Sequence, residues 1–345
     1  MKRTLDFRYV IVRNGADYTT ICPSKATSIK CNRNSRIKMS FTGTFRLNTK
    51  VNWLTDSIRP EIIIDGVHHS LGLFLPATVR FDRTDAEELV AVEAYDSCWK
   101  VMDNYTESLL YFAAGTNYLE PVKLLLAAAG IAIIAETPTT ATLATNRQDW
   151  PVGTSYIDVI NQLLSEINYN ELWFNSDGAA VLEPITIPSA QNIDHTFDTN
   201  NVKCLILPNR SRQTDIYTAP NVFIVICSNA DNAAPMVATS ENTNPQSPLS
   251  IARRGRRIAT VVQVDNIADQ NELQAYADTL RNNSMISGEI ISMKTGLLPG
   301  FGVYDVVGLI NDDFMDVCIE SEWQMKLEVG GEMSHTLERV VVNLG

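Results

Sequence analysis

Hydrophobic and polar positions alternate most regularly near the end of the chain, in the segment WQMKLEV at residues 323–329. Alternation with a period of two predicts a strand that buries one of its faces. The dipeptide Gly330-Gly331 follows, which is typical of a tight hairpin turn, and residues 332–342 run back. The pattern therefore predicts a β-hairpin at the end of the chain.

The first hundred residues show the same period in several short segments. Extended patterns occur at residues 8–12, 36–45, 61–64, 67–75, 78–81 and 88–95. The dipeptide Asp65-Gly66 separates two of them and is a strong signal for a hairpin turn. Many short strands at near-regular spacing predict a barrel or a sandwich.

A helical period appears in the middle of the chain, directly before a hairpin pattern. Apolar residues fall on one helix face at Tyr156, Val159, Ile160, Leu163, Leu164 and Ile167. Ser155 and Asp158 have the spacing of a capping box and mark the expected helix start. Residues 171–174 and 179–182 then form two expected strands around a turn at 175–178.

A second helix is expected at residues 119–133, with Pro121 in its first turn and Gly130 as its end or as a sharp turn. Residues 97–111 before it are expected to be a partly helical crossover. These elements together predict a small α/β unit.

Strand patterns return after residue 185, at 222–227, 258–264 and 303–309. Residues 229–248 are rich in Asn, Ser, Ala and Pro and are expected to form a long loop. Residues 269–282 are expected to be a helix, with Asp269 and Glu272 at its start.

The expected fold class is α+β and mainly β. We predict an N-terminal barrel-like β domain at residues 1–103 and a small α/β domain at 104–185. A second barrel-like domain at 186–345 is interrupted by the loop and helix at about 229–285. The 345 residues suffice for roughly two or three such domains.

Charge is distributed unevenly along the sequence. The total is −12, but residues 1–50 hold eleven Lys and Arg against two acids, a net charge of +9 that leaves −21 for the remainder. The basic segment is either a solvated strand face or a surface for an acidic neighbouring subunit. Nucleic-acid binding is disfavoured, because the basic residues are dispersed and lack a stripe of stacking aromatics.

Targeting and redox signals are weak. The N-terminus has no apolar run long enough for a signal peptide, and residues 124–135 are too short to span a bilayer. The six cysteines show no CxxC pair. We therefore expect a protein made in a cytoplasm, with free buried thiols and no membrane insertion.

The search for chemistry yields no recognised motif for nucleotide binding, hydrolysis or zinc binding. His68-His69 lie on opposite faces of an expected strand, His195 is expected in a solvated loop, and His335 is expected to be an ordinary strand residue. Paired acids occur at Asp85, Glu87, Glu88, Asp312, Asp313 and Asp316. Acids beside turns are usually solvated, and Cys98 has no His nearby. No catalytic, cofactor-binding or metal-ligating residue is predicted.

The strongest local cluster is Arg253, Arg254, Arg256 and Arg257 around Gly255. Four guanidinium groups can bind phosphate or the carboxylates of a partner. The alternative is a hairpin turn with charged flanks. Because the cluster follows the long expected loop, we favour a subunit contact.

The order of these parts resembles the baseplate hub proteins of contractile-tailed phages and related injection systems, which include the late control protein D family and hubs of defective prophages. Four segments carry the resemblance, namely residues 153–184, NELQAYADTLRNNS with GEIISM, LLPGFGVYDVVGLI, and the terminal hairpin. In the third segment Tyr304-Asp305 stands where the family usually has Gly-Asp.

The resemblance implies a homotrimer whose two barrel-like domains per chain make a pseudo-sixfold ring. Such a ring joins the hexameric tail tube to the trimeric spike. Implied partners are the tail tube protein, the spike protein, other baseplate proteins and a tape-measure protein, with DNA passing through the channel without specific binding. The implied location is the tail baseplate of a virion or phage-derived particle, after synthesis in a bacterial cytoplasm.

Two other functions remain open from the residues alone. One is a tail-associated cell-wall hydrolase, which would need a lytic domain beyond the hub-like parts. The other is a β protein that binds a carbohydrate or receptor, with sugars stacked on Trp53, Trp99, Trp150, Trp173 or Trp323. The tryptophans are dispersed, so we favour a non-enzymatic hub without a cofactor.

Overall fold

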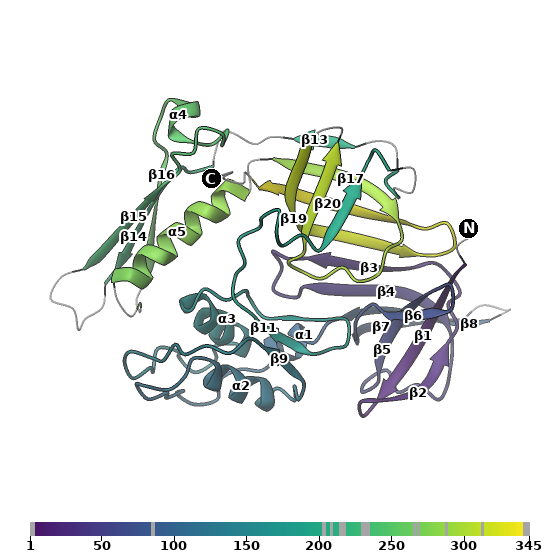
Figure 1. Cartoon of the computed structure of the whole chain (residues 1–345). Coiled ribbons are helices and arrows are strands. Elements are labelled where there is room, and N and C mark those ends of the chain that lie inside the picture. The colour runs from purple at the N-terminus through teal and green to yellow at the C-terminus, as the bar shows by residue number, and fades with distance from the viewer. Residues whose placement is uncertain are drawn as a thin grey trace.

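The computed structural model describes residues 4–83, 87–201, 205–207, 210–213, 219–228, 235–264, 267, 270–286, 289–311 and 314–340. Strands hold many more of these residues than helices do, so the expected mainly β fold is confirmed. Figure 1 shows the β-rich part at the centre and right and two helix-containing parts at the left.

The N-terminal part consists of eight strands in two sheets. They are β1 (Leu5–Arg13), β2 (Ala16–Ile21), β3 (Thr27–Asn32), β4 (Met39–Arg46), β5 (Ser57–Ile64), β6 (Val67–Ser70), β7 (Leu75–Arg83) and β8 (Glu88–Tyr95). One sheet has the order β2-β1-β5-β6, and β3, β4, β8 and β7 belong to a larger sheet. The predicted hairpin between β5 and β6 is confirmed, with Asp65 at φ 51° and Gly66 at φ 85° in its turn.

The C-terminal part adds six strands to the larger sheet. They are β12 (His195–Asp198), β13 (Ser211–Gln213), β17 (Ile290–Gly296), β18 (Val306–Asn311), β19 (Phe314–Leu327) and β20 (Glu332–Val340). The predicted terminal hairpin is confirmed, since β19 and β20 pair antiparallel around the turn at Gly330, whose φ is 77°. That left-handed backbone is easy for glycine alone.

Strand β19 joins the two parts. On one side it pairs with β20. On the other side, residues 314–319 pair with β18 and residues 322–327 pair with β3. The register with β20 shifts between Glu320 and Glu322, as in a β-bulge, where the partner on the other side changes. One sheet therefore continues from β13 at one edge to β7 at the other.

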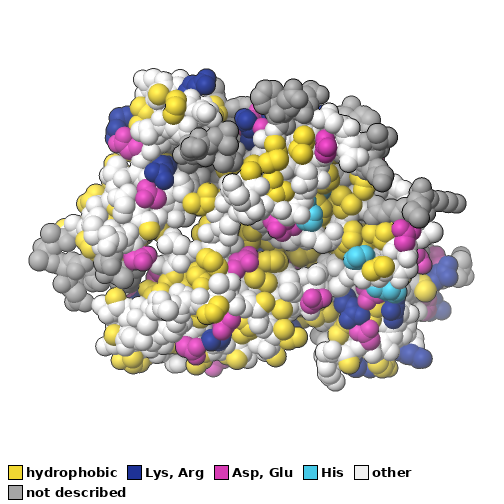
Figure 2. Space-filling view, viewed as in Figure 1, with side chains coloured by type: hydrophobic (Ala, Val, Ile, Leu, Met, Phe, Trp, Pro, Cys, Tyr) yellow, Lys and Arg dark blue, Asp and Glu magenta, His cyan; other side chains and the backbone are white. Residues whose placement is uncertain are grey.

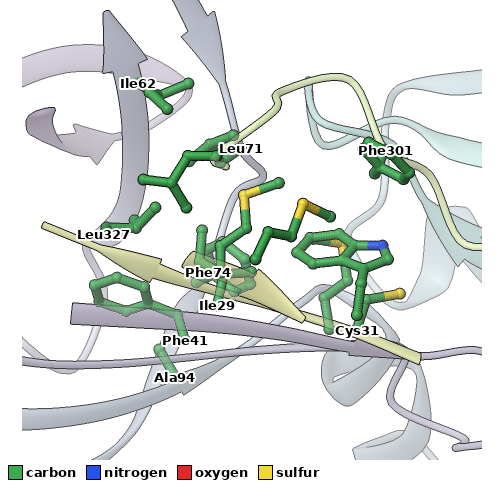
Figure 3. Packing of buried hydrophobic residues seen from close by; sticks show 14 of the residues in the cluster. Ile29, Cys31, Phe41, Ile62, Leu71, Phe74, Ala94, Phe301 and Leu327 are labelled. Atoms are coloured by element: carbon green, nitrogen blue, oxygen red, sulfur yellow. The ribbon is translucent and has the colours of Figure 1, made fainter. Parts of the chain in front are cut away.

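Both ends of the chain also share one hydrophobic core. Phe41 and Phe74 from the N-terminal part lie near Leu327 from β19, and Phe301 closes the other end of the cluster (Figure 3). Trp323 is 2% exposed within it. Because burial of such side chains contributes about 1.5–3 kcal/mol each, the two β parts stabilise each other.

The α/β unit has its own core and six short elements. They are α1 (Cys98–Asp103), α2 (Leu119–Ala128), β9 (Ile134–Glu136), α3 (Tyr156–Glu166), β10 (Trp173–Phe174) and β11 (Ala180–Leu182). The predicted helix at 119–133 ends earlier, and Gly130 follows with φ 76°. The turn at 175–178 is confirmed, because the Asn175 carboxamide oxygen accepts hydrogen bonds from the backbone of Asp177 and Ala179.

The expected capping box at the start of α3 is wrong. The Ser155 hydroxyl donates to the carbonyl of Met102 at 2.7 Å, and no side chain caps the helix. Asp158 pairs instead with Arg36 at 3.1 Å. Contacts with other segments thus take both side chains away from the local bond.

A further unit is inserted between β13 and β17. It contains β14 (Val222–Cys227), β15 (Met236–Glu241), α4 (Ile251–Arg254), β16 (Ala259–Val264) and α5 (Gln270–Ile286), with the sheet order β15-β14-β16. The loop expected at 229–248 is wrong in part, because β15 lies within it. Asp269, expected at the helix start, lies outside the described residues. No helix in the described part of the chain is long and apolar enough to cross a membrane.

Candidate functional site

The arginine cluster lies at the end of helix α4, where that helix turns into strand β16. The Ser250 hydroxyl caps the helix by accepting a bond from the Arg253 backbone at 3.2 Å, and Gly255 ends it with φ 65°. The alternative interpretation as a hairpin turn is therefore wrong. The local sequence needs glycine here because the left-handed backbone closes the helix.

The four guanidinium groups make different contacts. Arg253 donates to the Pro245 carbonyl at 2.8 Å, and Arg254 donates to the Ala219 carbonyl. Arg257 pairs with Glu241 at 2.6 Å. Arg253, Arg256 and Arg257 are exposed, whereas Arg254 is half-buried. Because each guanidinium has five N–H donors, the exposed members keep capacity for a partner's carboxylates.

The basic N-terminal segment pairs with acids elsewhere in the same chain. Around the β3–β4 hairpin, Lys30 lies 2.9 Å from Glu322, and Arg36 pairs with Asp158. Lys38 lies 2.6 Å from Glu171. Glu322 belongs to β19, while the other two acids belong to the α/β unit. Three of the eleven basic residues in this segment are therefore paired with acids where three parts of the molecule meet.

Lys38 is the centre of this junction, since its side chain is 0% exposed. Its ammonium also donates to the Arg33 carbonyl at 2.7 Å and lies 5.9 Å from the centre of the Tyr304 ring. A pocket of about 440 Å³ opens beside it, lined by Lys30, Asn32, Ser35, Arg36, Ile37, Lys38, Ser40, Tyr95 and Met102. The three cations of this wall all have carboxylate partners, so the pocket is a weak anion site.

A buried polar cluster lies at the bulge of β19. His335 Nδ1 is 2.7 Å from Glu320, and His335 Nε2 is 2.9 Å from the Thr295 hydroxyl. This order of acid, imidazole and hydroxyl resembles a hydrolase triad. However, the Thr295 hydroxyl donates to the Gly296 carbonyl, and the three residues are at most 2% exposed. A substrate has no access to it, so we assign the cluster a structural role.

Burial sets the protonation of this pair. It lowers the pKa of His335 to about 4, with a smaller effect from His195. Burial also raises the pKa of Glu320 well above its usual range, and the charge of Asp305 adds to the effect. Both shifts favour the uncharged forms, in which the Glu320 carboxyl donates to His335 Nδ1 and the His335 Nε2–H donates to Thr295.

His195 lies in β12 and not in a solvated loop, so that expectation is wrong. Its ring stacks on Phe301 with centroids 3.8 Å apart, and its Nε2 lies 2.9 Å from Asp305. Asp305 also accepts a bond from the Gly302 backbone at 2.7 Å. These contacts join segments more than a hundred residues apart, so no local pattern could reveal them.

The remaining candidates are structural where they are described. His68 pairs with Glu61 at 3.0 Å, and Asp316 pairs with Arg212 and Arg339. Among the other paired acids, Glu87 lies near Arg46 and Glu88 near Arg83. The acids that lie outside the described residues are Asp85, Asp312 and Asp313. The described residues hold no group of His, Cys, Asp and Glu suited to a metal ion.

The candidate thiol and the tryptophan side chains also have structural surroundings. Cys98 is buried, and its thiol donates to the Leu172 carbonyl at 3.5 Å. Trp150 and Trp323 are buried, and the other three tryptophans are half-buried. A sugar ring needs an open aromatic face, and the described tryptophans offer little of one.

No protein-family model matches this chain, and no curated protein matches it in sequence. Solved structures do match. A tail protein from Neisseria meningitidis MC58 has a TM-score of 0.70 at 13% identity, covering 96% of both chains. The 43 kDa tail protein of prophage MuSo2 from Shewanella oneidensis has a TM-score of 0.68 at 9% identity, covering 97% of this chain and 98% of the other.

A third match comes from a secretion machine. The E. coli c3393 protein, a component of the type VI secretion system, has a TM-score of 0.53 at 7% identity, covering 96% of this chain and 77% of the other. The matched proteins are tail and secretion-system components, and the coverage includes the helical units as well as the sheets. This chain therefore has the fold of phage tail proteins over nearly its full length.

Proposed function

We propose that this protein is the structural hub of a contractile tail baseplate, in a phage or a phage-derived particle. The supporting observation is the similarity of nearly the whole chain to phage tail proteins. In the proposed division, residues 1–103 and 186–345 supply two barrel-like ring domains, and residues 104–185 form the α/β domain between them.

Three copies of this chain would present six barrel-like domains in one ring. A closed ring of this kind adapts threefold to sixfold symmetry, which suits a protein between a trimeric spike and a hexameric tube. The shared strand β19 supports the proposal, because pairing with both β3 and β18 holds the two β parts in a fixed relation. If the two β parts keep one relative orientation, three chains can place six similar domains around one ring.

The proposed partners are the tail tube, the spike, other baseplate proteins and the tape-measure protein, within the virion baseplate after synthesis in the bacterial cytoplasm. The arginine cluster at 253–257 is the proposed subunit contact. Outside residues 1–50 the chain carries a net charge of −21, which supports a channel that DNA passes by like-charge repulsion. A basic channel in an assembled ring would contradict this last part.

The molar mass in solution tests the proposal. We expect a species of three times the 38.3 kDa chain, either for the pure protein or after coexpression with its cognate spike. Electron micrographs of that species should show a ring with six lobes. A monomer that stays monomeric with the spike present would contradict the hub.

We further propose that the protein is not an enzyme. The matched structures are tail and secretion components, and the one triad-like arrangement in the described residues is buried. Purified protein added to bacterial cell walls should leave their turbidity unchanged, with lysozyme as the positive control. Clearing of the suspension would favour the alternative of a cell-wall hydrolase.

A further inference from the structure

Helix α5 closes one of the two edges of the three-stranded sheet in the inserted unit, the edge formed by β15. The N–H of Asn242, which follows β15, donates to the carbonyl of the residue before β14 at 2.9 Å. Because hydrogen bonds alternate along an antiparallel pair, the backbone groups of Val237 and Thr239 point away from β14. Their carbonyls accept bonds from the side chains of Gln270 at 3.0 Å and Gln274 at 3.2 Å, both in α5. The outward carbonyls of β15 are thus already bonded.

The opposite edge, formed by β16, has no such cover among the described residues. Strand β16 runs parallel to β14, and the carbonyls of Ile258 and Val264 accept bonds from the β14 side at 3.1 Å and 3.3 Å. The alternation then turns the backbone groups of Ala259, Val261 and Gln263 outward. These outward N–H and C=O groups have no partner in the part of the chain that the structure describes.

The other edge strands of the molecule are protected against pairing with a further strand. Strand β7 carries Arg80, Asp82 and Arg83, and its register with β8 shifts after Pro76. Strand β2 carries Asp17, and its register with β1 also shifts. The edge strands β6, β9, β10, β12 and β13 have at most four residues each. Short length, charge and bulges are the usual protection of edges, so β16 is the exception among the described strands.

The side chains along β16 are also suited to a strand partner. Its six residues, ATVVQV, include no charge and no proline. Val261 is 57% exposed and lies beside Ile224 of β14, on the face opposite the core under α5. Charged side chains are sparse along the left margin of the molecule below α4, where Figure 1 places β14 and β15 (Figure 2). An uncharged segment with β-branched side chains therefore fits this edge.

The size of the edge decides what kind of partner it takes. Six residues of strand are about 20 Å long and the edge of a sheet is about 10 Å thick, so edge pairing covers on the order of 200 Å² per partner. A stable contact between two folded proteins buries about 800 Å² per partner. Pairing of two copies through β16 alone is therefore too small for a dimer. An extended segment can also cover the open sheet face, and tethering within one particle gives it an effective concentration of about 1 mM.

We propose that β16 accepts an added strand from another protein. The partner is an extended, uncharged segment rich in Val, Ile and Thr, and it pairs with the outward backbone groups of Ala259, Val261 and Gln263. Antiparallel pairing is favoured because it is the more stable arrangement. The place of the partner in the same tail assembly rests on the proposed function, whereas the acceptor edge itself does not.

Hydrogen exchange with a peptide probe tests the acceptor edge. In the free protein the amides of Val261 and Gln263 should exchange faster than those of Thr260 and Val262, which bond to β14. The probe is the end-capped peptide KTVTVTVK. At about 1 mM it should slow exchange at Val261 and Gln263 at least about threefold, which corresponds to a Kd of about 0.5 mM. The same peptide with N-methyl groups on its six central residues should have no effect.

Substitutions at Val261 test the same edge from the side of the protein. Val261→Pro removes an outward N–H but no bond to β14, and Val261→Lys places a charge that opposes strand pairing. Each should abolish the effect of the peptide at Gln263. Val237→Pro is the matched control, because Val237 is 50% exposed and its N–H points outward at the closed edge. This control should keep the effect of the peptide, and Val261→Lys decides the test if the proline variant does not fold.

The acceptor edge would be wrong if the peptide left exchange at Val261 and Gln263 unchanged in the wild type, or slowed it equally in all variants. A trimer that shows no effect of the peptide removes the acceptor edge and leaves the hub intact. A peptide effect on a protein that stays monomeric with its spike supports the edge and contradicts the hub. A wild-type dimer that Val261→Lys dissociates would make a second copy the occupant and overturn the proposed partner.

Discussion

Glu320 and Glu322 lie two residues apart in β19 on either side of the bulge, and their surroundings differ strongly. The side chain of Glu320 is 1% exposed and bonds to His335 in the core. The side chain of Glu322 is 36% exposed and pairs with Lys30 and with the Asn32 carboxamide at 3.0 Å. Both acids serve the junction of the β parts, yet only one of them is cut off from water.

The difference shows how burial decides what a polar group contributes. Glu322 is hydrated before and after folding, so its ion pair adds little beyond local order. Glu320 loses its hydration on folding, and its second oxygen, Oε1, has no bonded partner among the described residues. The stability of the folded protein therefore depends on the proton that Glu320 shares with His335, because a buried charge without full compensation is costly. The following predictions test this contrast from the largest expected effect to the smallest.

Replacing the buried acid should cost the most. Glu320→Ala leaves His335 Nδ1 unpaired in the core and opens a cavity, so the free energy of unfolding should fall by about 2–4 kcal/mol. Denaturant unfolding measures the change. Glu322→Ala is the matched control in the same strand, with an expected loss below about 1 kcal/mol. Equal losses in the two variants would refute the contrast.

The pH dependence of the unfolding free energy should also reflect the buried pair of His335 and Glu320. The pKa of His335 in the folded protein is about 4, below its ordinary value of 6.5, so the folded state binds fewer protons between these values. The contribution of neutral His335 to the free energy of unfolding is therefore complete above pH 6.5 and is lost as the pH falls towards 4. Glu320 has the opposite slope in part of this window, so the test is the difference in unfolding free energy between the wild type and His335→Gln, which should change by about 3 kcal/mol between pH 7 and pH 4.

The carboxyl of Glu320 changes the unfolding free energy with the opposite sign. The pKa of Glu320 is raised in the folded protein, so its contribution is complete at low pH and is lost as the pH rises through the raised value. Glu320→Gln cannot ionise, and its amide can still donate to His335. Its unfolding free energy should therefore fall less than that of the wild type as the pH rises above 4.5, the ordinary pKa of a Glu carboxyl. An unchanged slope would show that Glu320 is already ionised in the folded state.

Lys38 lies between the two extremes, because its own side chain is buried while its partner Glu171 is 54% exposed. Lys38→Met keeps most of the apolar stem but removes the ammonium from Glu171 and the Arg33 carbonyl. The unfolding free energy should fall by about 1–2 kcal/mol, since Glu171 can turn to water. Thermal unfolding measures this loss, and an effect as large as that of Glu320→Ala would contradict the explanation.

The exposed pair Arg36 and Asp158 should matter least. The Arg36 side chain is 65% exposed, so Arg36→Ala should change the unfolding free energy by at most about 0.5 kcal/mol. Added salt should reduce even this difference, because exposed charges are screened. A loss above about 1 kcal/mol that persists at high salt would mean that the hairpin contact is more than an exposed ion pair.

Local patterns predicted the elements that depend on neighbours in sequence. The terminal hairpin followed from the alternation in residues 323–329 with glycine after it, and the turn at Asp65-Gly66 followed from its dipeptide. The apolar face of α3 also agreed with its sequence period. Expectations failed where distant segments compete for the same atoms, as at Ser155, or where a strand lies in a polar stretch, as β15 does.

The sequence by itself determined the mainly β character, the positions of most helices and hairpins, and the uneven distribution of charge, because each depends on local spacing and residue type. Only the tertiary structure decided that β19 pairs with both β18 and β3, that Lys30 meets Glu322, and that His335 is buried against Glu320. Pairings between distant segments depend on complementarity across the whole core, and no short stretch of sequence carries that information.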